Sequence, residues 1–173
     1  KDTAKQVVEY NITASVYNTE TAEALSAEAV KIGKTVKIHI KIDTGMSRIG
    51  FVPSEQSIEE IISVSKLPNV EIEGIFTHFA CSDSNDDAMT LKQFEKFMYV
   101  VSELEAKGLS IPIRHCCNSA AIIKYPKMHL DMVRAGIILY GMYPSDIEYD
   151  IDLKPLMNFK TSVINVKTMQ PGE

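Results

Sequence analysis

The chain has little of what marks several large classes of protein. Its 173 residues include no tryptophan and only three cysteines, two of them adjacent. Neither a disulfide framework nor a zinc-ligand spacing is present, so we expect reduced, buried thiols in a cytoplasmic protein. No apolar run approaches the roughly 20 residues that a membrane-spanning helix needs. A net charge of −5 without a Lys/Arg cluster argues against nucleic-acid binding.

The N-terminal sequence lacks familiar features as well. It begins at Lys1 without a methionine and resembles no signal peptide. We therefore expect it to start inside a longer chain. A hydrophobic content of 45% and a charged content of 24% are ordinary for a globular protein, and the length is sufficient for one domain with a real core.

Strand and helix patterns alternate along the chain, which predicts an α/β fold. Expected helices cover 3–10, 19–32, 54–66, 88–107 and 119–124, and expected strands cover 12–17, 36–43, 70–77, 111–116 and 133–139. Such alternation predicts a parallel sheet with right-handed crossovers, although periodicity does not separate an open sheet from a barrel. After Pro155 the pattern changes, and 159–169 alternates like an antiparallel strand. We expect a parallel domain at 1–154 and the start of a β-rich domain at 155–173.

The most informative segment runs from a β-branched strand into a glycine-containing turn that carries Arg48. Alternation places the apolar side chains of the strand on one face and the polar ones on the other. In a barrel of parallel strands the apolar face packs against outer helices and the polar face points inward, so Lys41 and Arg48 would meet at the edge where active sites are built. The alternative is a solvated edge strand followed by an ordinary turn. The apolar set is Val36, Ile38, Ile40 and Ile42, and the polar set is Lys37, His39, Lys41 and Asp43.

The pairing of Lys41 with Arg48 predicts unusual chemistry. Two confined cations repel each other, which lowers the lysine pKa and favours a neutral amine. A neutral amine can add carbon dioxide to form a carbamate, an anion that would pair with Arg48. A lysine beside an ordinary carboxylate is the alternative.

Other candidate residues follow the predicted strands at the edge where parallel sheets bind ligands. Ser119 opens a short helix after Asn118, and Gly136 lies on the last predicted strand. A helix N-terminus near a glycine that lets a ligand approach the backbone predicts a phosphate site, with a plain N-cap as the alternative.

Arg134 and His78 are two further candidates. Arg134 lies in an apolar strand and is not expected to be buried without a partner. The alternative to a functional role is an internal ion pair with Asp131, Asp43 or another acid. His78 alone is more often a core histidine than a catalyst.

Four motifs resemble those of the alanine racemase family in order and rough spacing, over essentially all 173 residues. The first and the last are long and specific, whereas the two short ones would be weak alone. They are Lys41-Ile42-Asp43-Thr44-Gly45-Met46-Ser47-Arg48-Ile49-Gly50, Thr77-His78-Phe79-Ala80, Asn118-Ser119-Ala120-Ala121 and Asp131-Met132-Val133-Arg134-Ala135-Gly136-Ile137-Ile138-Leu139-Tyr140-Gly141.

This resemblance implies a pyridoxal-phosphate enzyme that interconverts L- and D-alanine for peptidoglycan synthesis. The implied protein is a head-to-tail homodimer with an eight-stranded (β/α) TIM-type barrel followed by a β-rich domain. Ser119, Gly136 and Ile137 resemble the phosphate-binding positions, the last two through backbone N–H groups. Arg134 resembles the arginine that faces the pyridine nitrogen of the cofactor, and His78 resembles the histidine that orients this arginine.

The resemblance also implies roles for two cations and marks two departures. Arg48 resembles the arginine near the cofactor's phenolic oxygen and the substrate carboxylate, and Lys41 resembles the lysine that is carbamylated in many members. The family's cofactor-linked lysine would precede Lys1, and its tyrosine base would follow Glu173. Without that lysine and tyrosine, this segment alone is expected to be inactive. The predicted strands would be the last five of the barrel. A serine or broad-specificity racemase and a non-catalytic cofactor-binding module are the alternative functions.

Overall fold

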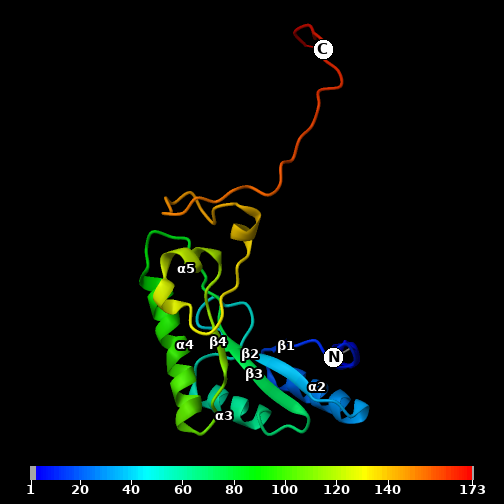
Figure 1. Cartoon of the computed structure of the whole chain (residues 1–173), viewed down its shortest axis with the longest axis vertical. Coiled ribbons are helices and arrows are strands. Elements are labelled where there is room, and N and C mark those ends of the chain that lie inside the picture. Colours follow the sequence, from blue (N-terminus) through cyan, green and yellow to red (C-terminus); the bar gives the residue numbers. More distant parts are fainter. Residues whose placement is uncertain (1–2, 173) are drawn as a thin grey trace.

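A computed structural model describes residues 3–172 (Figure 1). Lys1, Asp2 and Glu173, at the outer ends of the two predicted domains, lie outside the described residues. The α-helices are α1 (Ala4–Glu9), α2 (Thr19–Ile32), α3 (Glu55–Val64), α4 (Ala88–Ala106) and α5 (Ser119–Lys124), with short 3-10 helices η1 (Pro126–Met128) and η2 (Ile137–Tyr140). The strands are β1 (Ala14–Val16), β2 (Val36–Lys41), β3 (Val70–Phe76) and β4 (Ile113–His115). They form one parallel sheet in the order β1-β2-β3-β4, which confirms the predicted α/β class.

Short polar caps and glycines set the helix ends. Asn18 accepts a hydrogen bond from the backbone N–H of Thr21 at the start of α2, and Gly33 ends that helix in the left-handed conformation. At α3 the Ser54 hydroxyl accepts from the backbone N–H of Ser57 at 3.2 Å. The predicted helix boundaries at Gly33 and Ser54 are therefore confirmed.

Replacing Ser54 with alanine removes the only side-chain acceptor that caps the start of α3 within the described residues. We expect the free energy of unfolding to fall by about 1 kcal/mol, the usual cost of an N-cap loss. Urea denaturation measures it. An unchanged midpoint would show that water satisfies the freed N–H equally well.

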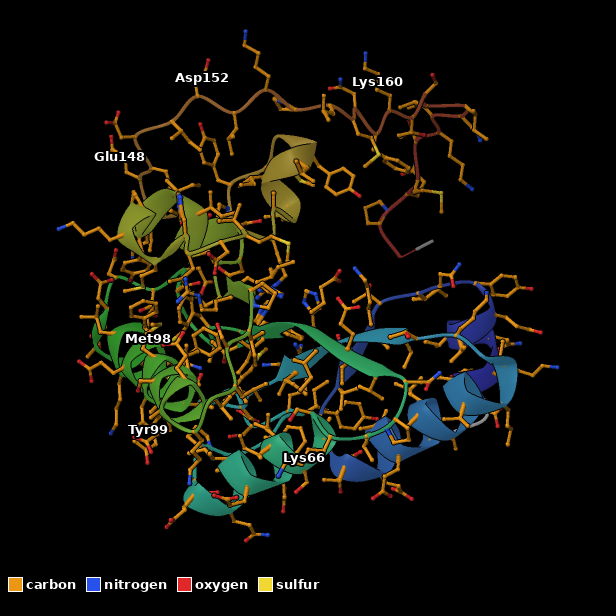
Figure 2. All side chains as sticks on the ribbon, turned by 60° about the horizontal axis from the view of Figure 1, so that its bottom comes forward. Lys66, Met98, Tyr99, Glu148, Asp152 and Lys160 are labelled. Atoms are coloured by element: carbon orange, nitrogen blue, oxygen red, sulfur yellow. The ribbon has the colours of Figure 1, made fainter. Side chains whose placement is uncertain are left out.

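The core lies between the sheet and an arc of helices. The apolar face of β2, predicted to face the outer helices, is buried together with the inward stripes of α2, α3 and α4. Figure 2 shows these helices curving around one side of the strands. The opposite face of the sheet carries Lys37, His39 and Lys41, as the alternation predicts. The sheet face that the helices do not cover is therefore polar, and it is called the inner face below.

The predicted fifth strand at 133–139 is wrong. The chain runs beside β4, where the Asp131 N–H donates to the Arg114 carbonyl at 3.1 Å and the Arg134 N–H to the Cys117 carbonyl at 3.0 Å. These bonds are spaced by three residues, which does not fit the two-residue period of a parallel ladder. Gly136 has φ −112° and ψ −103°, and the chain then turns into η2. The apolar run that resembles a strand is therefore an irregular segment followed by a 3-10 turn.

Two further expectations about strands are corrected. β1 and β4 are shorter than predicted, because each pairs through only three residues with its neighbour. No strand forms at 159–169, where the side chains of Phe159 and Ile164 are 96% and 98% exposed. A strand needs a hydrogen-bonded partner, and the described chain offers none there. The segment carrying Glu148, Asp152 and Lys160 runs apart from the sheet and α3 (Figure 2).

Within residues 3–172, no helix combines the length and the apolar content needed to span a membrane.

Candidate functional site

The ends of β2, β3 and β4 bring Lys41, His78, His115 and Arg134 together, and these four residues are called the strand-end cluster below. Phe76 lies among them. Its ring is 5.3 Å from the Lys41 Nζ and 5.3 Å from the Arg134 Cζ, and it stacks on the His115 ring at 4.8 Å. The aromatic face thus supports both cations, which attract the negative face of a ring.

Arg134 is held by several acceptors, none of them a carboxylate. Nη1 donates to the His115 Nδ1 at 2.6 Å and Nη2 donates to the Thr77 carbonyl at 2.8 Å. Longer contacts from Nη2 reach the Cys116 carbonyl at 3.3 Å and the His78 Nδ1 at 3.4 Å. In the described part of the chain, this leaves Nε and one Nη1 hydrogen to donate to a ligand.

The alternative ion pair of Arg134 is excluded by the partners of the two acids. Asp131 accepts from the Arg114 Nε at 2.8 Å and from the Arg114 backbone N–H at 2.9 Å. Asp43 accepts backbone N–H bonds from the 43–48 turn instead. Arg134 therefore projects a positive charge that the described residues do not neutralise.

His115 is a residue that the sequence analysis missed. It lies closer to Arg134 than His78 does, so the shorter of the two histidine contacts comes from an unpredicted residue. Burial, and next the charge of Arg134, lower the pKa of His115 to about 3 and that of His78 to about 4. Both imidazoles are therefore neutral near pH 7 and can accept from the guanidinium. The sequence did hold a signal for His115: it is the last residue of β4, and β4 pairs with β3, the strand that His78 follows.

Lys41 has a depressed pKa, as predicted, but the main cause differs. The side chain is only 3% exposed, and its Nζ donates to the Ile42 carbonyl at 2.9 Å. Burial lowers the pKa of Lys41 to about 8; Asp43 opposes the shift, while Arg134 and then Arg48 add to it. Desolvation therefore outweighs the repulsion from Arg48 on which the expectation was based.

The turn after β2 is built around the Asp43 carboxylate. Oδ1 accepts from the backbone N–H groups of Gly45 and Ser47, both at 3.0 Å, and Oδ2 accepts from that of Arg48 at 2.9 Å. Burial raises the pKa of Asp43, but these three donors and Lys41 outweigh it and lower the pKa overall. The turn presents the exposed Arg48 side chain near enough to the strand-end cluster to lower the pKa values of Lys41 and His78.

Gln93, which the sequence analysis missed, joins the loop after β2 to the loop after β3 through hydrogen bonds. Gln93 of α4 is 2% exposed, and its Nε2 donates to the Thr44 Oγ1 at 3.2 Å and to the His78 carbonyl at 3.3 Å. Its Oε1 accepts from the Ala80 N–H at 2.9 Å, and the Thr44 and Thr77 hydroxyls are 2.8 Å apart. The sequence pattern of α4 could not predict that Gln93 joins these loops, because its hydrogen-bond partners lie far away in the sequence.

Ser119 lines a small cavity and is hydrogen-bonded to Gly136. The Gly136 N–H donates to the Ser119 Oγ at 2.9 Å, and the N-cap of α5 is Asn118, whose Oδ1 accepts from the Ala121 N–H at 3.1 Å. The alternative reading of Ser119 as a plain N-cap is therefore wrong, and its hydroxyl proton stays available to a ligand.

This cavity measures about 260 Å³ and is open to solvent. Ser119, Ile137 and His78 contribute to its lining, together with the exposed acid Asp83. A larger open hollow of about 680 Å³ lies against Tyr99 of α4, and among the described residues its lining includes none of the candidate site residues; neither hollow is lined by Lys41, Arg48 or Arg134. The smaller cavity is the one that adjoins the candidate residues.

The cysteines are free thiols, as expected, and two of the three are buried. Cys116 and Cys117 both donate to the Met128 carbonyl at 3.2 Å, whereas Cys81 is partly exposed. The prediction of a buried residue is thus wrong for Cys81.

Taken together, the strand-end cluster offers the charge of Arg134, which no acid of the described residues neutralises, and two neutral imidazoles, with the Ser119 hydroxyl near His78. Such a set suits an anionic ligand.

Comparison with known proteins gives a consistent result. Residues 1–144 match the model of the alanine racemase N-terminal domain. The alanine racemase of Clostridium tetani is 50% identical over 168 residues, covering 96% of this chain and 43% of the relative, and that of Methanococcus maripaludis is 50% identical over 164 residues, covering 94% and 44%.

Solved structures show the same likeness. Alanine racemase from Clostridium difficile 630 in complex with cycloserine superposes with a TM-score of 0.87 at 42% identity, covering 89% of this chain and 43% of that one. The Bacillus anthracis enzyme with bound L-Ala-P gives a TM-score of 0.77 at 30% identity, covering 87% and 39%. The chain thus spans less than half the length of these relatives. On the match of its first 144 residues and these identities, the chain belongs to the alanine racemase family through its N-terminal domain.

Proposed function

We propose that the protein carrying this chain is an alanine racemase that interconverts L- and D-alanine with pyridoxal phosphate. The observation that carries the proposal is Arg134, a donor-only group held by His115 and Thr77, without a carboxylate partner in the described residues. From the family resemblance we also propose that this protein supplies D-alanine for peptidoglycan, that it is cytoplasmic and that it is a homodimer.

The residues of the strand-end cluster fit this cofactor chemically. The Ser119 hydroxyl and the backbone near Ile137 suit a phosphate. The Gly136 N–H already donates to the Ser119 Oγ, and an added Cβ at Gly136 would meet only that atom, at 3.4 Å. Arg134 keeps free N–H groups for a ring nitrogen, and Arg48 adds positive charge for a phenolate or carboxylate. Asp83 opposes an anion, but it is exposed and therefore screened by water.

Pyridoxal phosphate, when bound, supplies an electron sink for the negative charge that develops at Cα. Arg134 governs how strong that sink is, because a guanidinium stays protonated and can only donate to the ring nitrogen. Arg134 would hold the ring nitrogen in its unprotonated form and so weaken the sink. A weaker sink would favour return of the proton to Cα, and therefore racemisation over transamination.

The other residues bind and orient. His115 and the Thr77 carbonyl hold the guanidinium, and the longer contact from His78 supports it. Arg48 would bind the substrate carboxylate, with its turn held by Asp43. The groups that move the proton at Cα are, by the family resemblance, a lysine and a tyrosine outside this chain.

We propose that β1 to β4 belong to the C-terminal part of a (β/α) barrel, with the β-rich domain beginning near Pro155. Support comes from the parallel order of β1 to β4 and from the change of sequence pattern after Pro155. In that assignment 133–139 occupies the fifth position, although it carries no ladder in this structure.

The direct test is a racemisation assay of the whole protein with pyridoxal phosphate, using L-alanine and L-serine in parallel. We expect D-alanine to form much faster than D-serine. A preference for L-serine would indicate a serine or broad-specificity racemase, and turnover of neither would favour a cofactor-binding module.

We further propose that Lys41 is carbamylated. Its pKa of about 8 leaves a substantial neutral fraction, and that amine can add carbon dioxide with release of one proton. With ¹³C-bicarbonate, a carbamate resonance should appear and grow as the pH rises through about 8. Lys41→Arg should abolish the signal. A bare amine in the wild-type protein under saturating bicarbonate would contradict the proposal.

A further inference from the structure

A continuous line of polar side chains crosses the inner face of the sheet and ends at Arg134. The Arg134 Nη1 is 2.6 Å from the His115 Nδ1, and the His115 Nε2 is 2.9 Å from the His39 Nδ1. The His39 Nε2 is in turn 3.3 Å from the Glu73 Oε2. The residues come from β2, β3, β4 and the segment after β4, so the line joins every strand of the sheet except β1.

The donor inventory allows only one placement of the protons. A guanidinium only donates, so the His115 Nδ1 must be an unprotonated acceptor and its Nε2 must carry the hydrogen. That hydrogen points at the His39 Nδ1, which must then be unprotonated, and the His39 Nε2 carries its own hydrogen toward Glu73. A carboxylate only accepts, so the line ends without conflict.

The far end of the line is anchored independently. Glu73 Oε1 accepts from the Lys37 Nζ at 2.7 Å, and Oε2 accepts from the Thr13 hydroxyl at 3.2 Å. The Lys37 bond lowers the pKa of Glu73 and keeps it ionised.

Both imidazole rings are confined. His39 packs against Gly74 so closely that an added Cβ would be 2.5 Å from its Cε1 and Nδ1. The His115 ring stacks on Phe76 with an interplanar angle of 4°. Neither ring can turn over without displacing a neighbour.

We propose that Glu73, acting through His39 and His115, is a positioning residue that fixes the His115 tautomer and thereby the orientation of Arg134. The inference rests on the proposed function for its catalytic consequence, since Arg134 is the group that would face the ring nitrogen. Arg134 and Glu73 select the same tautomers from the two ends of the line, and without the carboxylate only the guanidinium does so, because the His39 Nε2–H has lost its acceptor. The His115 Nδ1 can then carry a hydrogen that faces the guanidinium, and Arg134 must move.

The first readout is independent of catalysis. In the whole protein with ¹⁵N-labelled histidine, long-range ¹H–¹⁵N correlation spectra should show His115 and His39 as neutral Nε2–H tautomers. In Glu73→Leu the His115 pattern should become mixed. Glu71→Leu is the matched control, because Glu71 also pairs with Lys37, at 3.7 Å, but does not touch His39. Gly74→Ala, which displaces the His39 ring, is the second variant should Glu73→Leu fail to fold.

The second readout is the racemisation rate. Glu73→Leu and Gly74→Ala should lower kcat about ten- to hundredfold with little change in KM, because small displacements of a positioned group have effects of this size. Glu73→Gln should recover most of the rate, since its amide oxygen can still accept from the His39 Nε2. A wild-type His115 with a protonated Nδ1, or a Glu73→Leu variant that matches Glu71→Leu in both readouts, would overturn the inference. If the wild-type protein showed the expected tautomers but no racemisation, the proposed function would be wrong, while the inference that Glu73 positions Arg134 through the two histidines would still hold.

Discussion

Replacing Arg134 with glutamate should slow racemisation by about 10²–10³-fold, the usual cost of removing one preorganised donor from an active site. It should also allow transamination. A carboxylate can accept a hydrogen bond from a protonated ring nitrogen, which strengthens the electron sink and lets the proton be delivered away from Cα. The measurement combines chiral analysis of alanine with detection of pyruvate.

Arg134→Lys is the matched control for this experiment. Lysine is also a donor-only cation, but it lacks the planar fork that binds His115 and the Thr77 carbonyl together. It should therefore slow racemisation without producing pyruvate. An unchanged rate and an unchanged product in Arg134→Glu would contradict the account of the site.

Replacing Gly50 with alanine should destabilise the turn that carries Arg48. Gly50 has φ +136°, and an added Cβ would be 2.5 Å from the Asp43 N and 2.8 Å from the Ile42 carbonyl carbon. Both are backbone atoms at the end of β2, where the Asp43 N–H donates to the Phe51 carbonyl at 2.9 Å. We expect a loss of about 3 kcal/mol in the free energy of unfolding, from backbone strain and the clash together.

Gly33→Ala separates the two contributions. Gly33 also has a positive φ, +72°, but no atom lies within 4 Å of an added Cβ. It should cost only about 1 kcal/mol, the strain of a left-handed residue alone. Urea unfolding of both variants decides the matter, and equal losses would show that the turn can yield at Gly50.

Periodicity was sufficient to predict the layers of this fold. The alternation of β2 assigned its two faces correctly, since Ile38 and Ile40 are fully buried while His39 lies on the polar inner face. The cap at Ser54 and the stop at Gly33 follow from local chemistry and were equally accessible. These features depend on neighbours within a few residues.

The errors have a different physical origin. The run Ile137–Tyr140 has the composition of a strand, but the backbone of Gly136 leaves the β region and no partner ladder forms. The partners of Arg134 come from β3 and β4, so His115 and the Thr77 carbonyl could not be identified without the sheet register. The motif resemblance gave His78 as the histidine that orients Arg134, whereas the shorter histidine contact to Arg134 comes from His115.

The most direct test of the central claim is a crystal structure of the whole protein with pyridoxal phosphate bound. We predict that an Nε or Nη1 hydrogen of Arg134 donates to the pyridine nitrogen while its other Nη1 hydrogen still reaches the His115 Nδ1. The phosphate should contact the Ser119 hydroxyl and the backbone near Gly136. A carboxylate facing the ring nitrogen, or an Arg134 paired with an acid elsewhere, would contradict the account.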